Sequence, residues 1–123
     1  MQEKRRFQRV RFEARCSLAH NSDSYIGQVV NISMNGALLS FNDGLVIPKE
    51  ESCNLAIYLE GHENPLKMEV EVVHSNFTML GIKFTGLNCS VKDILTKIID
   101  RTFEEKGEYR GNSQPVYFSE IEG

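Results

Sequence analysis

Residues 10–18 have the sequence VRFEARCSL, in which apolar and polar side chains alternate without a break. Successive side chains of a β-strand point to opposite faces, so this alternation predicts a strand with one buried face and one solvated face. Similar short segments, separated by turn residues, follow at 25–32, 37–41, 55–59, 66–72 and 80–84. Together they predict a mainly β fold, a six-stranded antiparallel β-barrel that is closed or nearly closed.

The spacing of apolar residues changes after the last predicted strand. Val91, Ile94, Leu95, Ile98, Ile99 and Phe103 fall on one face at helical spacing. This pattern predicts a C-terminal α-helix, with Ser90 and Asp93 as a capping box and Gly107 as the stop. An amphipathic helix must bury its apolar face, so we expect it to plug or pack on one end of the barrel.

The 123 residues predict a single domain with two extensions. We expect a flexible basic N-terminal arm at 1–8, the barrel and helix at 9–106, and an acidic, mobile tail at 107–123. The net charge of -3 argues against binding long nucleic acid. A basic arm on an acidic body instead favours a small anionic partner. The basic residues near the N-terminus are Lys4, Arg5, Arg6, Arg9, Arg11 and Arg15.

The three cysteines, Cys16, Cys53 and Cys89, are far apart in the sequence and form no C-x-x-C motif. This spacing predicts neither a disulfide framework nor a metal site, and it suits the reducing cytoplasm. No apolar run approaches the roughly 18 residues that a membrane-spanning helix needs. We therefore expect a cytoplasmic protein that contains no membrane span, metal or cofactor.

Two short motifs carry recognisable chemistry. Residues 5–9, RRFQR, contain R-x-x-x-R, and residues 31–36, NISMNG, form N-x-S-x-x-G. The guanidinium groups of Arg5 and Arg9 are suited to bidentate contacts with phosphate and with the O6/N7 edge of guanine. In an extended arm Arg6 points elsewhere, towards a second phosphate. Asn31, Ser33 and Gly36 provide an amide, a hydroxyl and a glycine that allows a positive φ and a close ligand approach.

With these motifs in order on a barrel-like strand pattern, residues 4–106 resemble the PilZ domain, the bacterial receptor module for cyclic di-GMP. The resemblance implies that Arg5 and Arg9 clamp guanine and phosphate groups, that Asn31 and Ser33 contact a guanine, and that Gly36 shapes the turn. Two weaker candidates follow from it. Lys4 precedes the motif at a position that influences whether one ligand or a stacked pair is bound, and His74 lies where some members carry a tryptophan.

The resemblance implies a non-enzymatic cyclic di-GMP receptor, in which the ligand orders the arginine arm over the barrel and changes a partner-binding surface. Its protein partners would act in motility, secretion, exopolysaccharide synthesis or virulence control. Three other functions remain open on the sequence: a small barrel that binds RNA or single-stranded nucleic acid, an enzyme, and a protein-interaction scaffold with an unused ligand site. His74 likewise remains either a stacking residue or a rim residue.

Overall fold

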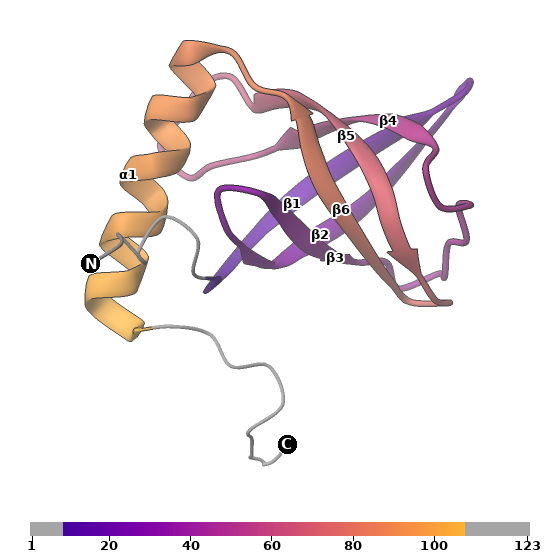
Figure 1. Ribbon diagram of the computed structural model, residues 1–123, viewed down its shortest axis with the longest axis horizontal. Coiled ribbons are helices and arrows are strands. Elements are labelled where there is room, and N and C mark those ends of the chain that lie inside the picture. Colours follow the sequence, from indigo (N-terminus) through magenta and orange to yellow (C-terminus); the bar gives the residue numbers. More distant parts are fainter. Residues whose placement is uncertain (1–8, 108–123) are drawn as a thin grey trace.

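The computed structural model describes residues 9–107, and the predicted arm at 1–8 and residues 108–123 of the predicted tail lie outside this part. Six strands are followed by one helix (Figure 1). The elements are β1 (Val10–His20), β2 (Asp23–Ile32), β3 (Gly36–Ser40), β4 (Ser52–Ile57), β5 (Leu66–Ser75), β6 (Met79–Gly86) and α1 (Cys89–Lys106). The mainly β fold with a C-terminal helix is therefore confirmed.

The six strands form a closed antiparallel barrel in the order β1-β2-β3-β6-β5-β4. The barrel closes because β1 pairs with β2 on one side and with β4 on the other. Every strand thus has two hydrogen-bonded neighbours, and inward-facing side chains from all six build one core. Leu18, Ile57, Val70 and Leu80 are fully buried there.

The alternation in the sequence translates directly into this core. On β4 and β5, every second side chain is buried, as the pattern of a half-buried strand requires. The alternation is interrupted where strands carry β-bulges, between Val29 and Asn31 on β2 and between Val72 and His74 on β5. A bulge inserts one extra residue, so the side chains beyond it change face. Both bulges lie beside the candidate site.

The helix α1 lies across one end of the barrel and contacts β1 and β5 (Figure 1). The helix buries Val91, Leu95, Ile99 and Thr102. The first three of these belong to the predicted apolar face. Burial of this face explains why the helix packs on the barrel. The expected position of the helix is confirmed.

The predicted start of α1 is wrong by two residues. The N-cap is Asn88, whose side-chain oxygen accepts a hydrogen bond of 2.9 Å from the backbone N–H of Val91. Asn88 has extended backbone angles, which allow its side chain to reach the first free N–H groups of the helix. Ser90 therefore lies inside the first turn. The predicted stop is correct: Gly107 has φ 75° and donates from its N–H to the carbonyl oxygen of Phe103.

Candidate ligand-binding site

The antiparallel pairing of β1 and β2 brings the two sequence motifs together. Val10 pairs with Ile32, so Arg9, just before β1, lies next to the end of β2. Nη1 of Arg9 donates a hydrogen bond of 2.7 Å to Oδ1 of Asn31. This contact joins the last arginine of R-x-x-x-R to the first residue of N-x-S-x-x-G, which are 22 positions apart.

Arg9 carries a positive charge at the edge of this contact. Its side chain is partly buried, and this burial lowers its pKa because desolvation disfavours the charged form. No ion pair between residues 9 and 107 involves Arg9. Asn31 is 2% exposed, and its oxygen is a neutral acceptor. A partly desolvated guanidinium whose hydrogen-bond partner within residues 9–107 is a neutral amide is well placed to bind an anion.

Ser33 has a different position from the one that the motif suggested. Its side chain is buried, and its hydroxyl oxygen accepts hydrogen bonds from the backbone N–H groups of Asn35 (3.1 Å) and Gly36 (3.3 Å). Its own backbone N–H donates to the carbonyl oxygen of Gly36 at 2.8 Å. The Ser33 side chain therefore holds the turn between β2 and β3 together. Its predicted contact with a guanine stays a prediction.

Gly36 begins β3, and it does not use the positive φ that glycine allows. The glycines of the described residues that have a positive φ are Gly44, Gly61 and Gly107. A Cβ on Gly36 would instead lie 2.1 Å from the carbonyl oxygen of Ile82 on β6. The close approach that requires glycine is thus an approach between two strands of the barrel. This approach fixes the position of the turn, and the predicted close approach of a ligand at Gly36 stays a prediction.

A shallow groove of about 170 Å³ opens beside the contact of Arg9 with Asn31. Its remaining walls come from three neighbouring strands, β3, β5 and β6, which contribute Ala37, Leu38, Val73, Gly81 and Ile82. Polar atoms therefore lie along one side and apolar surface along the rest. This combination suits a flat ring with a polar edge, such as a purine base.

The structure separates the predicted site residues into two groups. Arg9 and Asn31 line the groove, while Ser33 and Gly36 build the adjoining turn. Lys4, Arg5 and Arg6 lie outside the described residues. His74 is exposed and pairs with Gly81, but it is its neighbour Val73 that lines the groove.

Sequence reasoning missed Val73 and Gly81. The alternation of β5 assigns Val73 to the same face as Glu69 and Glu71, but it does not show that this residue borders the motif. The bulge between Val72 and His74 leaves Val73 as the extra residue, with 42% of its surface exposed. The sequence signal for this place is Gly81, because a glycine inside a strand often marks a close approach of another group.

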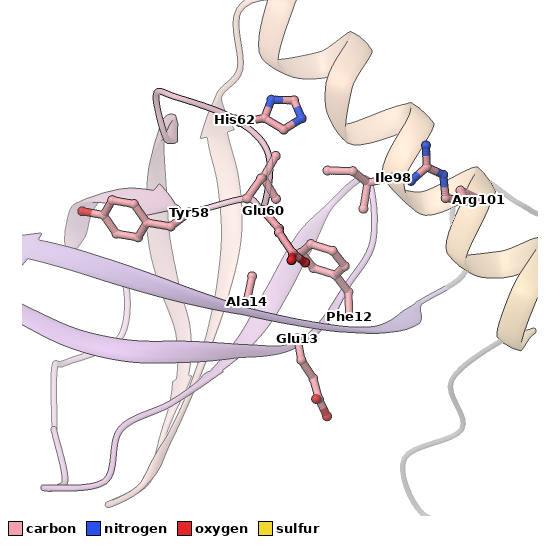
Figure 2. Close-up of a pocket in the computed structure, with 9 residues that line it drawn as sticks. Phe12, Glu13, Ala14, Tyr58, Glu60, His62, Ile98 and Arg101 are labelled. Carbon is pink, nitrogen blue, oxygen red and sulfur yellow. The ribbon is translucent and has the colours of Figure 1, made fainter.

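A larger groove of about 400 Å³ lies at the junction of the barrel and α1 (Figure 2). Phe12 of β1 and Ile98 of α1 border its apolar part, and Arg101 and His62 lie at its edge (Figure 2). Among the predicted site residues that the structure describes, Arg9, Asn31, Ser33, Gly36 and His74, none lines it. The groove follows from packing a helix on the end of a barrel.

Between residues 9 and 107, no group of three or more histidine, cysteine, aspartate or glutamate side chains is arranged to hold a metal ion. The single helix in that range is too polar to cross a membrane. The described cysteines, Cys16, Cys53 and Cys89, are free, and only Cys89 is exposed.

The fold is a closed six-stranded barrel with a C-terminal helix, and comparison with known proteins identifies its family. The model of the PilZ domain matches residues 3–101, so the chain belongs to the PilZ domain family. No match was found among curated protein sequences.

Solved structures share the fold at low sequence identity. The inhibitor of motility MotI/DgrA of Bacillus subtilis has 19% identity and a TM-score of 0.69, over 80% of this chain and 50% of that one. This chain therefore spans half the length of that protein. The PilZ domain of YcgR from Escherichia coli, solved with c-di-GMP, has 10% identity and a TM-score of 0.66, over 79% and 89%. PlzA of Borreliella burgdorferi, in complex with c-di-GMP, has 12% identity and a TM-score of 0.58, over 87% and 56%.

Proposed function

We propose that this protein is a non-enzymatic receptor for cyclic di-GMP. The observation that carries the proposal is the hydrogen bond between Arg9 and Asn31, which places parts of both motifs at one groove. Membership of the PilZ family supports it, and two structural neighbours were solved with this ligand. The ligand combines two phosphates with two guanine bases, which matches a site of guanidinium groups beside an amide.

The described residues have separate roles in this proposal. Arg9 uses its remaining N–H donors for a phosphate or for the O6/N7 edge of guanine, while Asn31 fixes the direction of its guanidinium group. Ser33 and Gly36 act mainly through the turn. The hydrogen bonds of Ser33 hold the backbone of Asn35 and Gly36. Because Gly36 has no side chain, β3 can approach β6 closely. The Ser33 hydroxyl accepts these two hydrogen bonds and can still donate its O–H, so a direct contact with guanine would replace only its 3.4 Å bond to the Gly36 carbonyl oxygen.

We further propose that ligand binding orders the arm that carries Arg5 and Arg6. Ordering a peptide segment costs conformational entropy, and charge-assisted contacts with the ligand phosphates would offset that cost. Lys4 adds a positive charge beside them, which favours a stacked ligand pair over a single molecule. The ordered arm would change the surface next to the groove, and a protein partner would recognise the new surface.

The partner is proposed as a protein of motility, secretion, exopolysaccharide or virulence control. The structural neighbour MotI/DgrA is an inhibitor of motility, which supports the first of these. The three free cysteines support a reducing cytoplasm as the place of action.

Binding of RNA or single-stranded nucleic acid is the second candidate. That class of barrel usually offers aromatic side chains on a basic face. Here the outward side chains of β5 include Lys67, Glu69 and Glu71, which mix both charges and lack an aromatic ring. A gel shift with mixed oligonucleotides at physiological salt distinguishes this function from the proposed one.

Isothermal titration calorimetry with cyclic di-GMP tests the proposal. We expect a dissociation constant in the micromolar range or below, and we expect Arg5→Ala and Arg9→Ala each to weaken binding at least about tenfold. Arg11→Ala is the control, because this arginine is exposed and its side chain pairs with Glu13. The measured stoichiometry also decides between one ligand and a stacked pair. Absence of binding up to about 100 μM ligand would contradict the proposal.

A further inference from the structure

Gly81 occupies an unusual position in the barrel. It lies inside β6, where it pairs with Leu38 of β3 and His74 of β5, and it lines the groove beside Arg9 and Asn31. A glycine inside a strand weakens the strand, because it has no side chain to pack and loses more backbone freedom than other residues on folding. Its presence there requires a reason.

The fold itself does not supply that reason. Gly81 does not have the positive φ that favours glycine. A Cβ at this position would meet the Cβ of His74 at 3.4 Å and Cγ2 of Val73 at 3.7 Å, which are ordinary contacts. Gly36 and Gly27 differ, since their Cβ atoms would lie 2.1 Å and 2.5 Å from backbone carbonyl oxygens. The barrel requires glycine at those two positions but not at Gly81.

The groove does supply a reason. Leu80 and Ile82 are buried, so a side chain on the residue between them would point outward, into the groove. Next to this gap lies Val73, the extra residue of the β5 bulge, which points outward in the alternation of the strand and is exposed. The missing side chain and the exposed Val73 together form an apolar floor. The polar atoms of Arg9 and Asn31 lie along its side.

We propose that Gly81 controls access of the ligand to the groove, and that a purine ring lies flat on the floor formed by Gly81 and Val73 while Arg9 and Asn31 contact its edge. This inference rests on the proposed function, from which cyclic di-GMP is taken as the ligand. It adds two binding residues that lie outside both sequence motifs. It also separates the glycines that the fold needs from one that the ligand needs.

Calorimetry with cyclic di-GMP on matched variants tests this inference. We expect Gly81→Val to weaken binding by about a hundredfold and Gly81→Ala by about tenfold, because each fills part of the space for the ring. Val73→Ser removes apolar contact without adding bulk and should weaken binding about threefold to tenfold. The controls on the same strand are Thr85→Val, at an exposed position, and Gly86→Ala. Neither residue lines the groove, so both variants should bind like the wild type.

Thermal unfolding of the same variants completes the test. Gly81→Ala should unfold at the wild-type temperature or above it, because its Cβ would make ordinary contacts with His74 and Val73. Wild-type affinity in both Gly81 variants would overturn this inference alone, while the proposed function would stand. Failure of both variants to fold would also overturn it, since the glycine would then be structural. Absence of binding in the wild type would overturn the proposed function and this inference with it.

Discussion

Oγ1 of Thr96 on α1 lies 3.7 Å from Sδ of Met34, although the two residues are 62 positions apart. Met34 belongs to the turn between β2 and β3, which follows Asn31 and contains Ser33. The turn beside the candidate ligand site therefore contacts the helix directly. A change in this turn can reach α1 through a single pair of side chains.

This contact predicts that α1 responds to the ligand. Hydrogen exchange of the wild type should show that cyclic di-GMP slows exchange both in the turn and in α1 around Thr96. In Met34→Ala the turn should remain protected by the ligand, while the added protection of α1 should fall, because the side-chain contact is lost. Met79→Ala, at the start of β6, is the control. Equal helix protection in Met34→Ala and the wild type would show that the contact transmits nothing.

The contact between Arg9 and Asn31 should also stabilise the fold. A partly buried hydrogen bond from a charged donor contributes about 1.5–3 kcal/mol, and Arg9→Ala leaves a buried oxygen without this donor. A double-mutant cycle with Asn31→Ala, measured by urea unfolding, should give a coupling energy of about 1–2 kcal/mol. The same cycle with Arg11→Ala should give a coupling near zero, since the side chain of Arg11 contacts Glu13. A zero coupling for Arg9 would mean that the bond is not formed in solution.

Ser33→Ala should lower the free energy of unfolding by about 1–3 kcal/mol, because two backbone N–H groups lose their acceptor inside the turn. Ser17→Ala is the matched control: the Ser17 hydroxyl contacts Tyr58 at an exposed place and should cost less than about 0.5 kcal/mol. Urea midpoints of both variants measure the difference. Similar midpoints would argue that the Ser33 hydroxyl is free for a ligand rather than engaged in the turn.

The N-cap of α1 can be tested with two neighbouring substitutions. Asn88→Ala removes the acceptor for the N–H of Val91 and should cost about 1 kcal/mol of stability. Ser90→Ala lies inside the first turn and should be neutral or slightly stabilising, since alanine is the better helix former. If Ser90→Ala were the more damaging of the two in a thermal melt, the helix would begin as its sequence suggested.

The buried thiol of Cys16 should make the folded protein less stable at alkaline pH. Burial raises the pKa of its thiol from 9.0 to about 11, and a hydrogen bond with the Gly27 backbone opposes this only in part. Between these values the unfolded chain loses the thiol proton while the folded protein keeps it, so the unfolded state is favoured as pH rises. The stabilisation present below pH 9 should decrease by about 2 kcal/mol by pH 11.

The measurement is the free energy of unfolding from pH 8 to about pH 11, compared with Cys16→Ala. The difference between the two proteins removes the effects of tyrosine and lysine titration. Between pH 8 and about pH 11, the free energy of unfolding should decrease less in Cys16→Ala than in the wild type, whatever the stability of the variant at pH 8. Parallel curves would mean that Cys16 does not titrate differently in the folded and unfolded states.

The barrel was predictable because its strands bury one face each. The pattern of Val10 to Leu18 has period two, and that period survives in the structure as the start of β1. The strand ends were less predictable. The sequence predicted strands at 10–18 and 25–32, but Asn21 takes φ 58° and forms the hairpin turn with Ser22. As a result, β1 extends to His20 and β2 begins at Asp23.

The candidate site was predictable only as far as its motifs. The contact of Arg9 with Asn31 agrees with the expectation that the motifs meet. The reasons for Gly36 and the surroundings of Ser33 depend on β6 and on the turn backbone, which no local pattern specifies. The floor of Val73 and Gly81 depends on a bulge whose position is set by the pairing of β5 with β6. The surroundings of Ser33 and Gly36 and the floor of the groove therefore depend on the pairing of strands that are distant in the sequence, which no local pattern predicts.

The order of the strands has a consequence for how quickly this protein folds. Two of the six pairings, β3 with β6 and β1 with β4, join strands that are separated by other strands along the chain. Such contacts form only after long loops have closed, and barrels dominated by them typically fold in about milliseconds to seconds. A newly synthesised chain cannot close its barrel before residues 52–57 have emerged to meet β1. Until then its first hairpin remains open to pairing with other chains.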